Sequence, residues 1–388
     1  MPARQTGIYL RMNDQGYVQQ IDLPQYYLER NILEKAKDTY IQEIQDIHQE
    51  LGDIHPIYMT LNSNLAGIYK SQGHWAKAEE LDVKIVEICN RLLGPDHPNT
   101  LKSKANLAET YGDQGCWDKA EELGIEIMEK RKRLLGPDHF DTLASMANLA
   151  ATSRNQGYWN EAKELKVQAI EISKRLLGPD HPDTLARMAS LLVTYSDLGE
   201  WNKAEELGVK VVETRKRLIG PDHSETLTSM ANLAAMYNHQ GQWSKAEELG
   251  IKVVETRKRL IGSDHPETVR SMANLAAMYS DQEYWDKAEE LQLQVLDIRQ
   301  KLLGLNHIDT VTSMENLAVI YGNQGHWSKA EKLGVKVLEI RQKILGLDDP
   351  NTLRSMANLV VIYQNQGYWD KAEELRVQGV KIEIKVLG

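Results

Sequence analysis

The chain has 388 residues, a formal net charge of −10 and a sequence pI near 5.6. This acidic balance argues against nucleic acid as the main partner, because phosphate binding requires a basic surface. The chain contains no run of about 18 apolar residues and no apolar secretory segment near residue 1, so we expect neither a membrane span nor secretion. Only Cys89 and Cys116 are present, which is too few for a disulfide framework and is typical of a cytoplasmic protein.

The eight tryptophans lie at a constant interval. Every consecutive pair is separated by 42 residues, from Trp75 to Trp369. A fixed period in this range is typical of a repeat array rather than of a globular enzyme fold. We therefore expect one continuous solenoid instead of the two or three domains (roughly) that the length alone would allow.

The N-terminal segment carries a weaker trace of the same period. Counting one period back from Trp75 places residues 33–51 in the frame of the second helix of a degenerate unit. Pro24 falls inside the matching first helix, so we expect that helix to be short or to begin there. Residues 1–56 are interpreted as an irregular N-terminal cap, and residues 57–388 as eight repeats.

One repeat, residues 226–267, contains two apolar stripes. Its first half places apolar side chains at steps of three or four residues, namely Leu227, Met230, Leu233, Ala234 and Tyr237. Its second half begins at Trp243 and continues through Ala246, Leu249, Val253 and Val254 to Leu260 and Ile261. Such spacing predicts an amphipathic helix in each half, here named helix A and helix B, with B about five turns long.

The joint between repeats also recurs. Leu-Gly-Pro-Asp-His-Pro stands at residues 93–98 and 177–182, with close variants elsewhere. We expect the glycine to occupy the left-handed position after helix B and the second proline to begin the next helix A. A single helix pair cannot bury its apolar stripe, so neighbouring pairs must stack into one core.

The order of these residues resembles a known repeat family. Asn-Leu-Ala, Tyr, Gln-Gly, Trp, Lys-Ala-Glu and the joint sequence recur over about residues 57–388 and resemble the tetratricopeptide repeat in its 42-residue form, as in kinesin light chains. The Ser-Met-Ala-Asn-Leu-Ala and Gln-Gly-x-Trp segments also resemble the C-terminal arrays of fungal nucleotide-binding receptors. This resemblance implies an all-α, right-handed superhelical solenoid of about eight helix-turn-helix repeats, in which the A helices line a concave groove.

Several repeats depart from the pattern. Ser153 replaces the tyrosine, Ser190 the asparagine, Glu283 the glycine and Phe140 the second joint proline. We expect these departures to weaken individual contacts without altering the architecture.

Helix A carries one asparagine in most repeats, and these are the first candidate binding residues. The series is Asn64, Asn106, Asn148, Asn232, Asn274, Asn316 and Asn358. Each amide offers a donor and an acceptor, which matches the peptide unit of an extended chain. The resemblance to kinesin light chains implies that these asparagines hold a peptide backbone. The alternative is that they bond to neighbouring helices and only fix the packing of the repeats.

Three cations lie one turn earlier in helix A. Lys102, Arg270 and Arg354 are candidates to attract an acidic segment. Small residues such as Ala231 and Ala235 flank the asparagines, which allows either close approach of a ligand backbone or tight curvature with nothing bound. Alanine at these two positions also means that the paired lysine and asparagine of chaperone-binding tetratricopeptide domains is absent, so chaperone tails are not expected ligands.

Three further series are interpreted as structural. A cation follows each tryptophan by sixteen residues, with an acidic residue four positions before it in most repeats, which is typical of i,i+4 pairs on a solvated helix face. The tryptophans are expected to be core or half-buried residues between helices A and B. The joint histidines occur once per repeat, and repeats stack about 10 Å apart, so we expect them to organise the turn rather than to bind zinc.

Together these patterns predict a protein-interaction scaffold that binds a partner peptide or segment in its groove. No catalytic residue and no cofactor or metal is expected, because no GxxxxGK[ST], HExxH or GxSxG motif occurs. One interpretation is the sensing array of a fungal nucleotide-binding receptor, and the alternatives are a kinesin-light-chain-like cargo adaptor or a self-assembling structural solenoid. Gly388 aligns with a joint glycine and no polar closing helix follows, so we interpret the chain either as a fragment of a longer protein or as an array whose C-terminal end is covered by another chain, which would allow self-association there.

Overall fold

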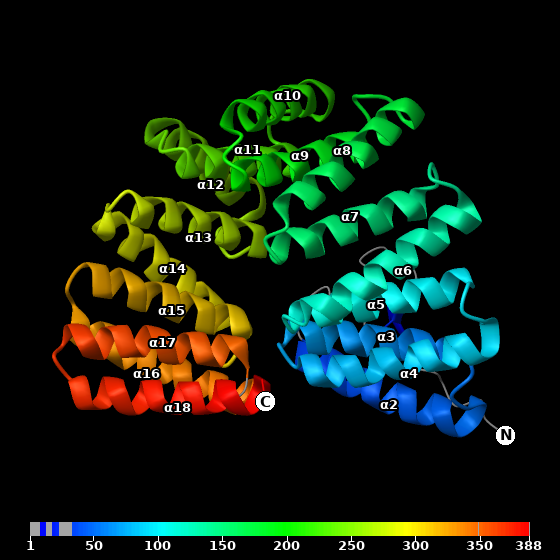
Figure 1. Ribbon diagram of the computed structural model, residues 1–388, viewed down its shortest axis with the longest axis horizontal. Helices are drawn as coiled ribbons and strands as arrows, with labels where there is room; N and C mark the ends of the chain where they lie inside the picture. Colours follow the sequence, from blue (N-terminus) through cyan, green and yellow to red (C-terminus); the bar gives the residue numbers. More distant parts are fainter. Residues whose placement is uncertain (1–7, 13–17, 23–32, 348, 388) are drawn as a thin grey trace. The chain divides into compact units, whose positions relative to one another are not determined.

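The computed structural model describes residues 8–12, 18–22, 33–347 and 349–387. In this part of the chain, two strands are followed by seventeen helices (Figure 1). The elements are β1 (Ile8–Met12), β2 (Val18–Asp22), α2 (Leu33–Leu51), α3 (Pro56–Ser71), α4 (Trp75–Leu93), α5 (Pro98–Asp113), α6 (Trp117–Leu135), α7 (Phe140–Asn155), α8 (Trp159–Leu176), α9 (Pro182–Asp197), α10 (Trp201–Ile219), α11 (Ser224–His239), α12 (Trp243–Ile261), α13 (Pro266–Asp281), α14 (Trp285–Leu303), α15 (Ile308–Asn323), α16 (Trp327–Ile344), α17 (Pro350–Asn365) and α18 (Trp369–Leu387). From α3 onwards, A helices alternate with B helices that each begin at a tryptophan, as the period predicts.

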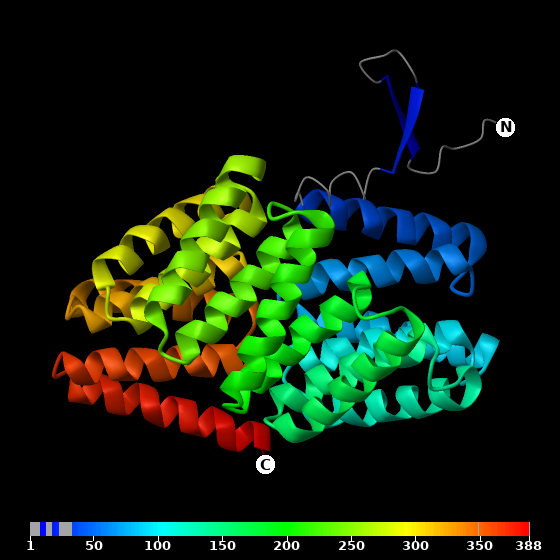
Figure 2. The ribbon, with the colours of Figure 1, turned by 90° about the horizontal axis from the view of Figure 1, so that it is seen from above.

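The two strands precede the repeats and pair with each other. They are antiparallel, with Ile8 opposite Asp22 (Figure 2). The 42-residue period does not reach this hairpin, so the sequence predicted only an irregular cap there. Residues 33–51 form helix α2 as expected. Pro24, with the short helix expected around it, and Gly388 lie outside the described residues.

The chain divides into two compact units, Met1–Arg131 and Lys132–Gly388. In the first unit, helices α2, α3 and α4 pack around Tyr40, Leu65 and Ile88. In the second unit, one apolar cluster takes residues from every helix between α9 and α15. Successive helix pairs of that unit therefore share a core, as stacked repeats require.

The apolar stripe of helix A is buried as the sequence predicts. In α11, Leu227, Met230, Leu233, Ala234 and Tyr237 are each at most 5% exposed. Deletion of any of these large side chains would remove apolar area from the shared core, at about 25 cal/mol per Å² of buried surface.

The stripe of helix B ends earlier than predicted. In α12, Val253 and Val254 are buried, but Leu260 and Ile261 are 47% and 44% exposed. Helix α12 has 19 residues whereas α11 has 16, so the last turn of helix B extends beyond its partner and has less surface to pack against.

The joint glycine adopts a conformation open mainly to glycine. Gly220 and Gly262 both have φ of 93°, with ψ of 159° and 161°. A left-handed helical residue would instead have ψ near about +47°, so the expected left-handed position is corrected to an extended one with positive φ. Any residue with a Cβ atom is strained in this region.

The joint histidine caps the following helix A. Nδ1 of His97 accepts a hydrogen bond from the backbone N–H of Asn99 at 3.2 Å. The same contact recurs at the other joint histidines, His55, His139, His181, His223, His265 and His307. In the last repeat, Asp349 takes this position and accepts from two backbone N–H groups. These contacts satisfy N–H groups that a helix start leaves unpaired, so the expected role in the turn is confirmed.

A buried arginine fastens helix B to the next helix A. Nη1 of Arg257 donates to the hydroxyl of Ser271 at 2.6 Å, and Nη2 lies 3.0 Å from the carboxylate of Glu267. The arginine–serine contact recurs between α10 and α11, between α14 and α15, and between α16 and α17. This series was not predicted from the sequence, although an arginine fourteen residues after the tryptophan was its signal.

A tyrosine of helix A makes a second polar link between helix pairs. Nζ of Lys245 lies 4.7 Å from the centre of the Tyr237 ring, and the Tyr237 hydroxyl donates to the carboxylate of Glu205 at 2.9 Å. The same arrangement recurs one repeat later, around Tyr279. Burial and the adjacent carboxylate raise the pKa of Tyr237 to about 12.

Candidate functional site

The A helices of the second unit form the wall along which the candidate residues lie. Helix α9 contacts α11, and α11 contacts α13 (Figure 1). Two cavities open on these helices. The α7–α9 cavity, of about 270 Å³, is lined by residues of α7, α8 and α9. The α9–α13 cavity, of about 500 Å³, is lined by residues of α9, α11 and α13 with Arg215 of α10.

Most of the candidate asparagines have amides that the protein itself does not use. Among the described residues, no hydrogen bond joins the following side chains to the protein: Asn106 in the first unit, and Asn148, Asn232, Asn274 and Asn316 in the second. All five are exposed or half-buried, and Asn232 lines the α9–α13 cavity. The alternative role in packing would require these amides to bond neighbouring helices, and the contacts of these five side chains do not support it.

Two asparagines of the series do bond to neighbouring residues. The amide of Asn64 donates to the hydroxyl of Tyr40 at 3.2 Å, and the amide of Asn358 donates to the carboxylate of Glu315 at 3.0 Å. For these two positions, the packing alternative describes the contacts better than the peptide-binding one.

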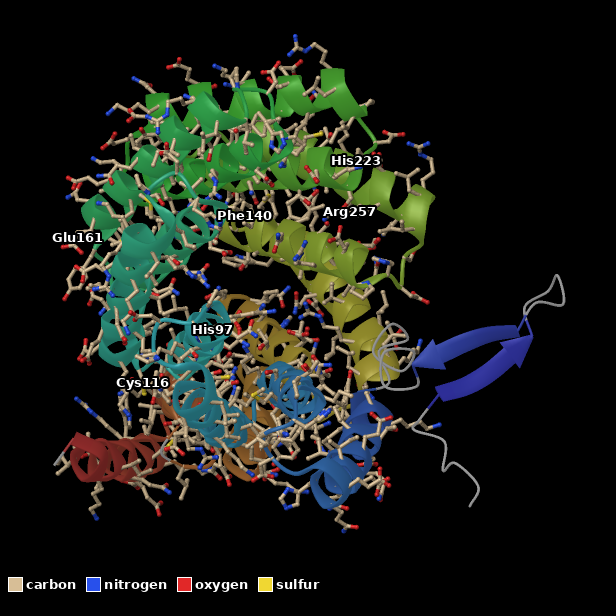
Figure 3. The ribbon with its side chains drawn as sticks, turned by 90° about the vertical axis from the view of Figure 1, so that its right-hand side faces the viewer. His97, Cys116, Phe140, Glu161, His223 and Arg257 are labelled. Atoms are coloured by element: carbon tan, nitrogen blue, oxygen red, sulfur yellow. The ribbon has the colours of Figure 1, made fainter. Side chains whose placement is uncertain are left out.

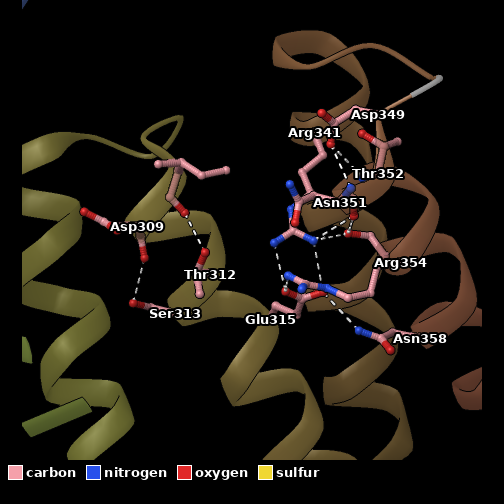
Figure 4. Close-up of polar contacts among 12 residues, drawn as sticks. Asp309, Thr312, Ser313, Glu315, Arg341, Asp349, Asn351, Thr352, Arg354 and Asn358 are labelled. Atoms are coloured by element: carbon pink, nitrogen blue, oxygen red, sulfur yellow. Dashed lines mark hydrogen bonds and ion pairs between the residues drawn. The ribbon is translucent and has the colours of Figure 1, made fainter. Parts of the chain in front are cut away.

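The three candidate cations differ in their surroundings. Lys102 is exposed, and within the described chain it forms no ion pair. Arg270 lines the α9–α13 cavity, where its guanidinium lies 3.3 Å from the carboxylate of Glu267. Arg354 lies 3.4 Å from the carboxylate of Glu315, in the network drawn in Figure 4. Of these three cations, Lys102 is therefore the one without an ion pair. An acidic ligand would have to compete with Glu267 for Arg270 and with Glu315 for Arg354.

Glu315 was not singled out from the sequence and proves to be the centre of that network. It stands where neighbouring repeats have alanine, and it is only 8% exposed. Its carboxylate accepts hydrogen bonds from Arg341 and Asn358 and lies beside Arg354 (Figure 4). An acidic residue at an alanine position was the signal that could have revealed it.

Five of the eight tryptophans are half-buried, within the expected range, and three are more exposed than expected. Trp159, Trp243 and Trp369 are 43%, 42% and 66% exposed, and the remaining five are half-buried. Each is the first residue of a B helix, so its ring reaches only the end of the preceding helix A. A Cβ atom on Gly322 of α15 would lie 3.2 Å from the ring of Trp327, so the ring closely approaches that end of the helix.

The cations sixteen residues after each tryptophan also pair differently from the prediction. This series is Arg91, Arg133, Arg175, Arg217, Arg259, Lys301, Lys343 and Lys385, and the side chain of the last lies outside the described set. Arg217 pairs with Asp180, 37 residues earlier, at 2.6 Å, and the neighbouring repeats repeat this contact. Helices A and B run in opposite directions, so the end of B lies beside the joint that precedes A. Lys301 does form the expected i,i+4 pair, with Asp297.

Three further features of the described part of the chain concern metal ligands, cysteines and membrane-spanning helices. Within residues 8–12, 18–22, 33–347 and 349–387, no three histidine, cysteine, aspartate or glutamate side chains gather as metal ligands would. Cys89 and Cys116 are free. None of the described helices is both long and apolar enough to cross a membrane.

Comparison with known proteins places these helix pairs in a family. Two family models of the tetratricopeptide repeat match the chain, one over residues 57–114, 193–250, 225–301 and 273–343, and the other over residues 100–141, 142–183 and 352–388. The first model alone covers more than half of the chain. Among curated proteins, none matches.

Solved structures of repeat proteins are also similar. A kinesin-light-chain-like protein of Podosopora anserina with nearly identical TPR-like repeats is 32% identical, with a TM-score of 0.45, and the match covers 53% of this chain and 97% of that one. BtubC (BKLC) from P. vanneervenii is 21% identical with a TM-score of 0.52, over 59% of this chain and 92% of that one. A signal transduction ATPase with a tetratricopeptide repeat sensor, from Pyrococcus horikoshii, is 14% identical with a TM-score of 0.47. The match covers 89% of this chain and 52% of that one.

Tetratricopeptide repeats are typically scaffolds for protein–protein interaction and are generally not enzymes. The family matches fall on the helix pairs that the tryptophan period marks and that the structure contains. The chain belongs to the tetratricopeptide repeat family.

Proposed function

We propose that the chain is a scaffold that binds an extended peptide segment along the A helices of its second unit. The observation that carries this proposal is the set of unused amides of Asn148, Asn232, Asn274 and Asn316, which are accessible and bond to no described residue. An amide that is satisfied by the protein would be unable to recognise a ligand without first breaking a bond. These amides require no such rearrangement.

The spacing of the repeats suits an extended ligand. Stacked helices lie about 10 Å apart, and an extended chain advances by about 3.3–3.6 Å per residue. One asparagine per repeat would therefore meet about every third peptide unit. The residues beside the asparagines are small, and Ala277 is exposed next to Asn274, so a ligand backbone can approach the helix closely.

The finer assignments belong to the same proposal. A sensing array of a fungal receptor and a kinesin-light-chain-like cargo adaptor would both use this surface, and they differ in the segment that it binds. We place both in the cytoplasm, in keeping with the free Cys89 and Cys116. Catalysis is not part of the proposal.

A second candidate function, self-association, is favoured by helix α18. Val380 is 46% exposed, whereas Leu338 and Val254, at the same position of earlier B helices, are 8% and 5% exposed. A second copy of the chain could cover this residue and Val377, which is 40% exposed. Sedimentation velocity of the chain and of Val380→Lys would test this: the proposal expects larger species at higher concentration that the substitution removes.

Selection from a displayed library of random peptides tests the main proposal. We expect the full chain to enrich peptides that bind in an extended form and that compete with one another for one surface. A denatured sample of the chain would control for adhesion to exposed apolar surface. Absence of any peptide whose binding depends on the folded chain would contradict the proposal.

A further inference from the structure

Around the α7–α9 cavity the repeat pattern is broken at three positions. Ser190 stands where the other seven repeats have asparagine, Arg187 where six repeats have serine, and Lys166 where four repeats have glycine. All three residues line the cavity. In a chain whose repeats are otherwise closely alike, three changes around one cavity indicate a specialised site.

At the joint between α8 and α9, the arginine is on helix A instead of helix B. In a regular joint, helix B carries the arginine and the next helix A carries the serine, as with Arg215 and Ser229. Here α8 carries Ser173 and α9 carries Arg187, at the same separation of fourteen residues. The exchange places the guanidinium on an A helix, where it lines the cavity.

Neither cation of this cavity has an acidic partner. Lys166 is 8% exposed, and its ammonium donates to the carbonyl of Ser190 at 3.1 Å and to the hydroxyl of Thr194 at 2.8 Å. Arg187 donates to the carbonyl of Leu143 at 3.2 Å, and its Nε is buried without a partner. Across the described chain neither residue forms an ion pair, whereas Arg215 and Arg257 of two regular joints do.

Burial therefore penalises two positive charges at one place. Burial lowers the pKa of Lys166 to about 8, Arg154 adds to this lowering, and Asp197 opposes it. Burial also lowers the pKa of Arg187, and Asp183 on the cavity wall offsets this only in part. An anion bound between the two cations would relieve both penalties.

We propose that the α7–α9 cavity is a subsite for a carboxylate, supplied by a glutamate or aspartate side chain of the bound segment. Its volume of about 270 Å³ accommodates such a group. Phe140, labelled in Figure 3, stands at the start of α7 and is 60% exposed. With Ala147, Ala169 and Ala186 it lines the cavity and gives an apolar wall for the methylene groups of that side chain. The subsite lies where Ser190 interrupts the asparagine series, so it would replace the missing amide contact. That the carboxylate belongs to a peptide rests on the proposed function.

The carboxylate site itself can be tested with small probes. Ligand-observed NMR titrations of the full chain would compare N-acetylglutamate N-methylamide with N-acetylglutamine N-methylamide, which differ only in the charged group. We expect binding of the acid and about tenfold weaker binding of the amide, as for loss of a charge-assisted hydrogen bond. Equal binding of the two probes would overturn the proposal. Tighter binding of inorganic phosphate than of the acid would replace the carboxylate by a phosphate and also overturn it.

Two substitutions locate the site within the chain. Lys166→Met removes the buried ammonium, and Arg187→Ser restores the residue that six other repeats carry at this position. Each is expected to weaken the acid probe about tenfold. Arg217→Ser, which removes an exposed guanidinium from helix B, is the matched control and should leave binding unchanged. Thermal unfolding verifies that the variants fold. Unchanged binding in Arg187→Ser would overturn the proposal even if Lys166→Met were unstable.

The peptide library separates this inference from the proposed function. Peptides selected by the wild-type chain should carry an acidic residue at one position, and those selected by Arg187→Ser should lose that preference but still be selected. Binding of the acid probe without selection of any peptide would support the carboxylate site and contradict the proposed function. Selection of peptides without an acidic position would support the function and contradict the inference.

Discussion

Arg341 and Glu315 form an ion pair with two parallel hydrogen bonds. Nη1 donates to one carboxylate oxygen at 3.0 Å and Nη2 donates to the other at 2.8 Å, with both side chains buried. In an earlier repeat the equivalent arginine, Arg257, pairs instead with Glu267, ten residues later in the chain. Asn351 occupies that later position in the last repeat. Glu315 thus supplies, from the preceding helix A, the carboxylate that Asn351 lacks.

Glu315→Ala should destabilise the second unit by about 3 kcal/mol, the usual cost of leaving one partner of a buried pair without the other. The double variant Glu315→Ala/Asn351→Glu should recover most of that loss, because it rebuilds the arrangement of Arg257 and Glu267. Urea denaturation monitored by circular dichroism would measure both. A double variant no more stable than the single one would contradict the compensation.

Glu283→Gly should stabilise the chain by about 1 kcal/mol. Glu283 has φ of 62°, in a turn where other repeats have glycine with positive φ. A side chain in this left-handed region costs about 1–2 kcal/mol that glycine avoids. As a control, Glu290→Gly at an exposed position in the second turn of α14 should be destabilising, because glycine disfavours a helix interior. A lower melting temperature for Glu283→Gly would argue against strain at this turn.

The stability of the native state should rise between pH 8 and pH 10 because of Lys166. Burial lowers the pKa of this lysine from 10.5 to about 8, with Arg154 adding to the lowering and Asp197 opposing it, in a cavity that also holds Arg187. In this interval the unfolded state binds more protons than the native state, so the free energy of unfolding increases, by about 2–3 kcal/mol. The gain is absent below about pH 7, where both states are protonated.

Lys166→Met isolates this effect, because it should lack the rise that the wild-type chain shows. The measurement ends at pH 10, because Tyr237 and Tyr279 act in the opposite sense above it. Their pKa values are raised to about 12, so the native state binds more protons between pH 10 and pH 12 and stability falls there. Parallel pH profiles for the wild type and Lys166→Met would show that Lys166 keeps an ordinary pKa.

The substitution Trp243→Ala should lower the free energy of unfolding by about 2 kcal/mol. Replacement of a fully buried aromatic residue typically lowers it by about 3–5 kcal/mol. The reason is that 42% of Trp243 is exposed. Trp201 is half-buried and packs against the main apolar cluster of the second unit, so Trp201→Ala should cost more. Denaturant titrations of the two variants give the comparison. Equal losses would mean that exposure of the ring does not determine its contribution.

The architecture could be predicted from the sequence because one periodic signal specifies it many times over. Every B helix begins at its tryptophan, and the buried stripe of α11 is the predicted one. The exposure of Trp159, Trp243 and Trp369 was not predicted, because periodicity places a residue on a helix without indicating how far the neighbouring helix extends. The exposure of Leu260 and Ile261 has the same cause. Helix α12 is three residues longer than α11, and this difference in length becomes apparent only when the two helices are packed.

The site could be predicted less completely, because its character depends on departures from the repeat. The asparagine series was apparent from the sequence, but which amides are already used depends on partners such as Glu315 and Tyr40. Arg187 and Lys166 come together only because α8 packs on α9. Arg187 stands where six other repeats have serine, and Lys166 stands where four other repeats have glycine. Both departures are visible when the repeats are compared position by position.

The central claim is that amides unused by the fold serve a ligand, and one double substitution tests it most directly. Asn232→Ala/Asn274→Ala should weaken binding of a library-selected peptide by about 10- to 100-fold, because up to four hydrogen bonds of about 0.5–1.5 kcal/mol each are lost. The matched control, Asn160→Ala/Asn202→Ala, removes two exposed asparagines from helix B and should bind normally. We predict that the melting temperature of the first variant stays within about 2 °C of the wild type, since no described residue bonds to these amides. A large fall in melting temperature with unchanged peptide affinity would contradict the claim and assign these asparagines to packing.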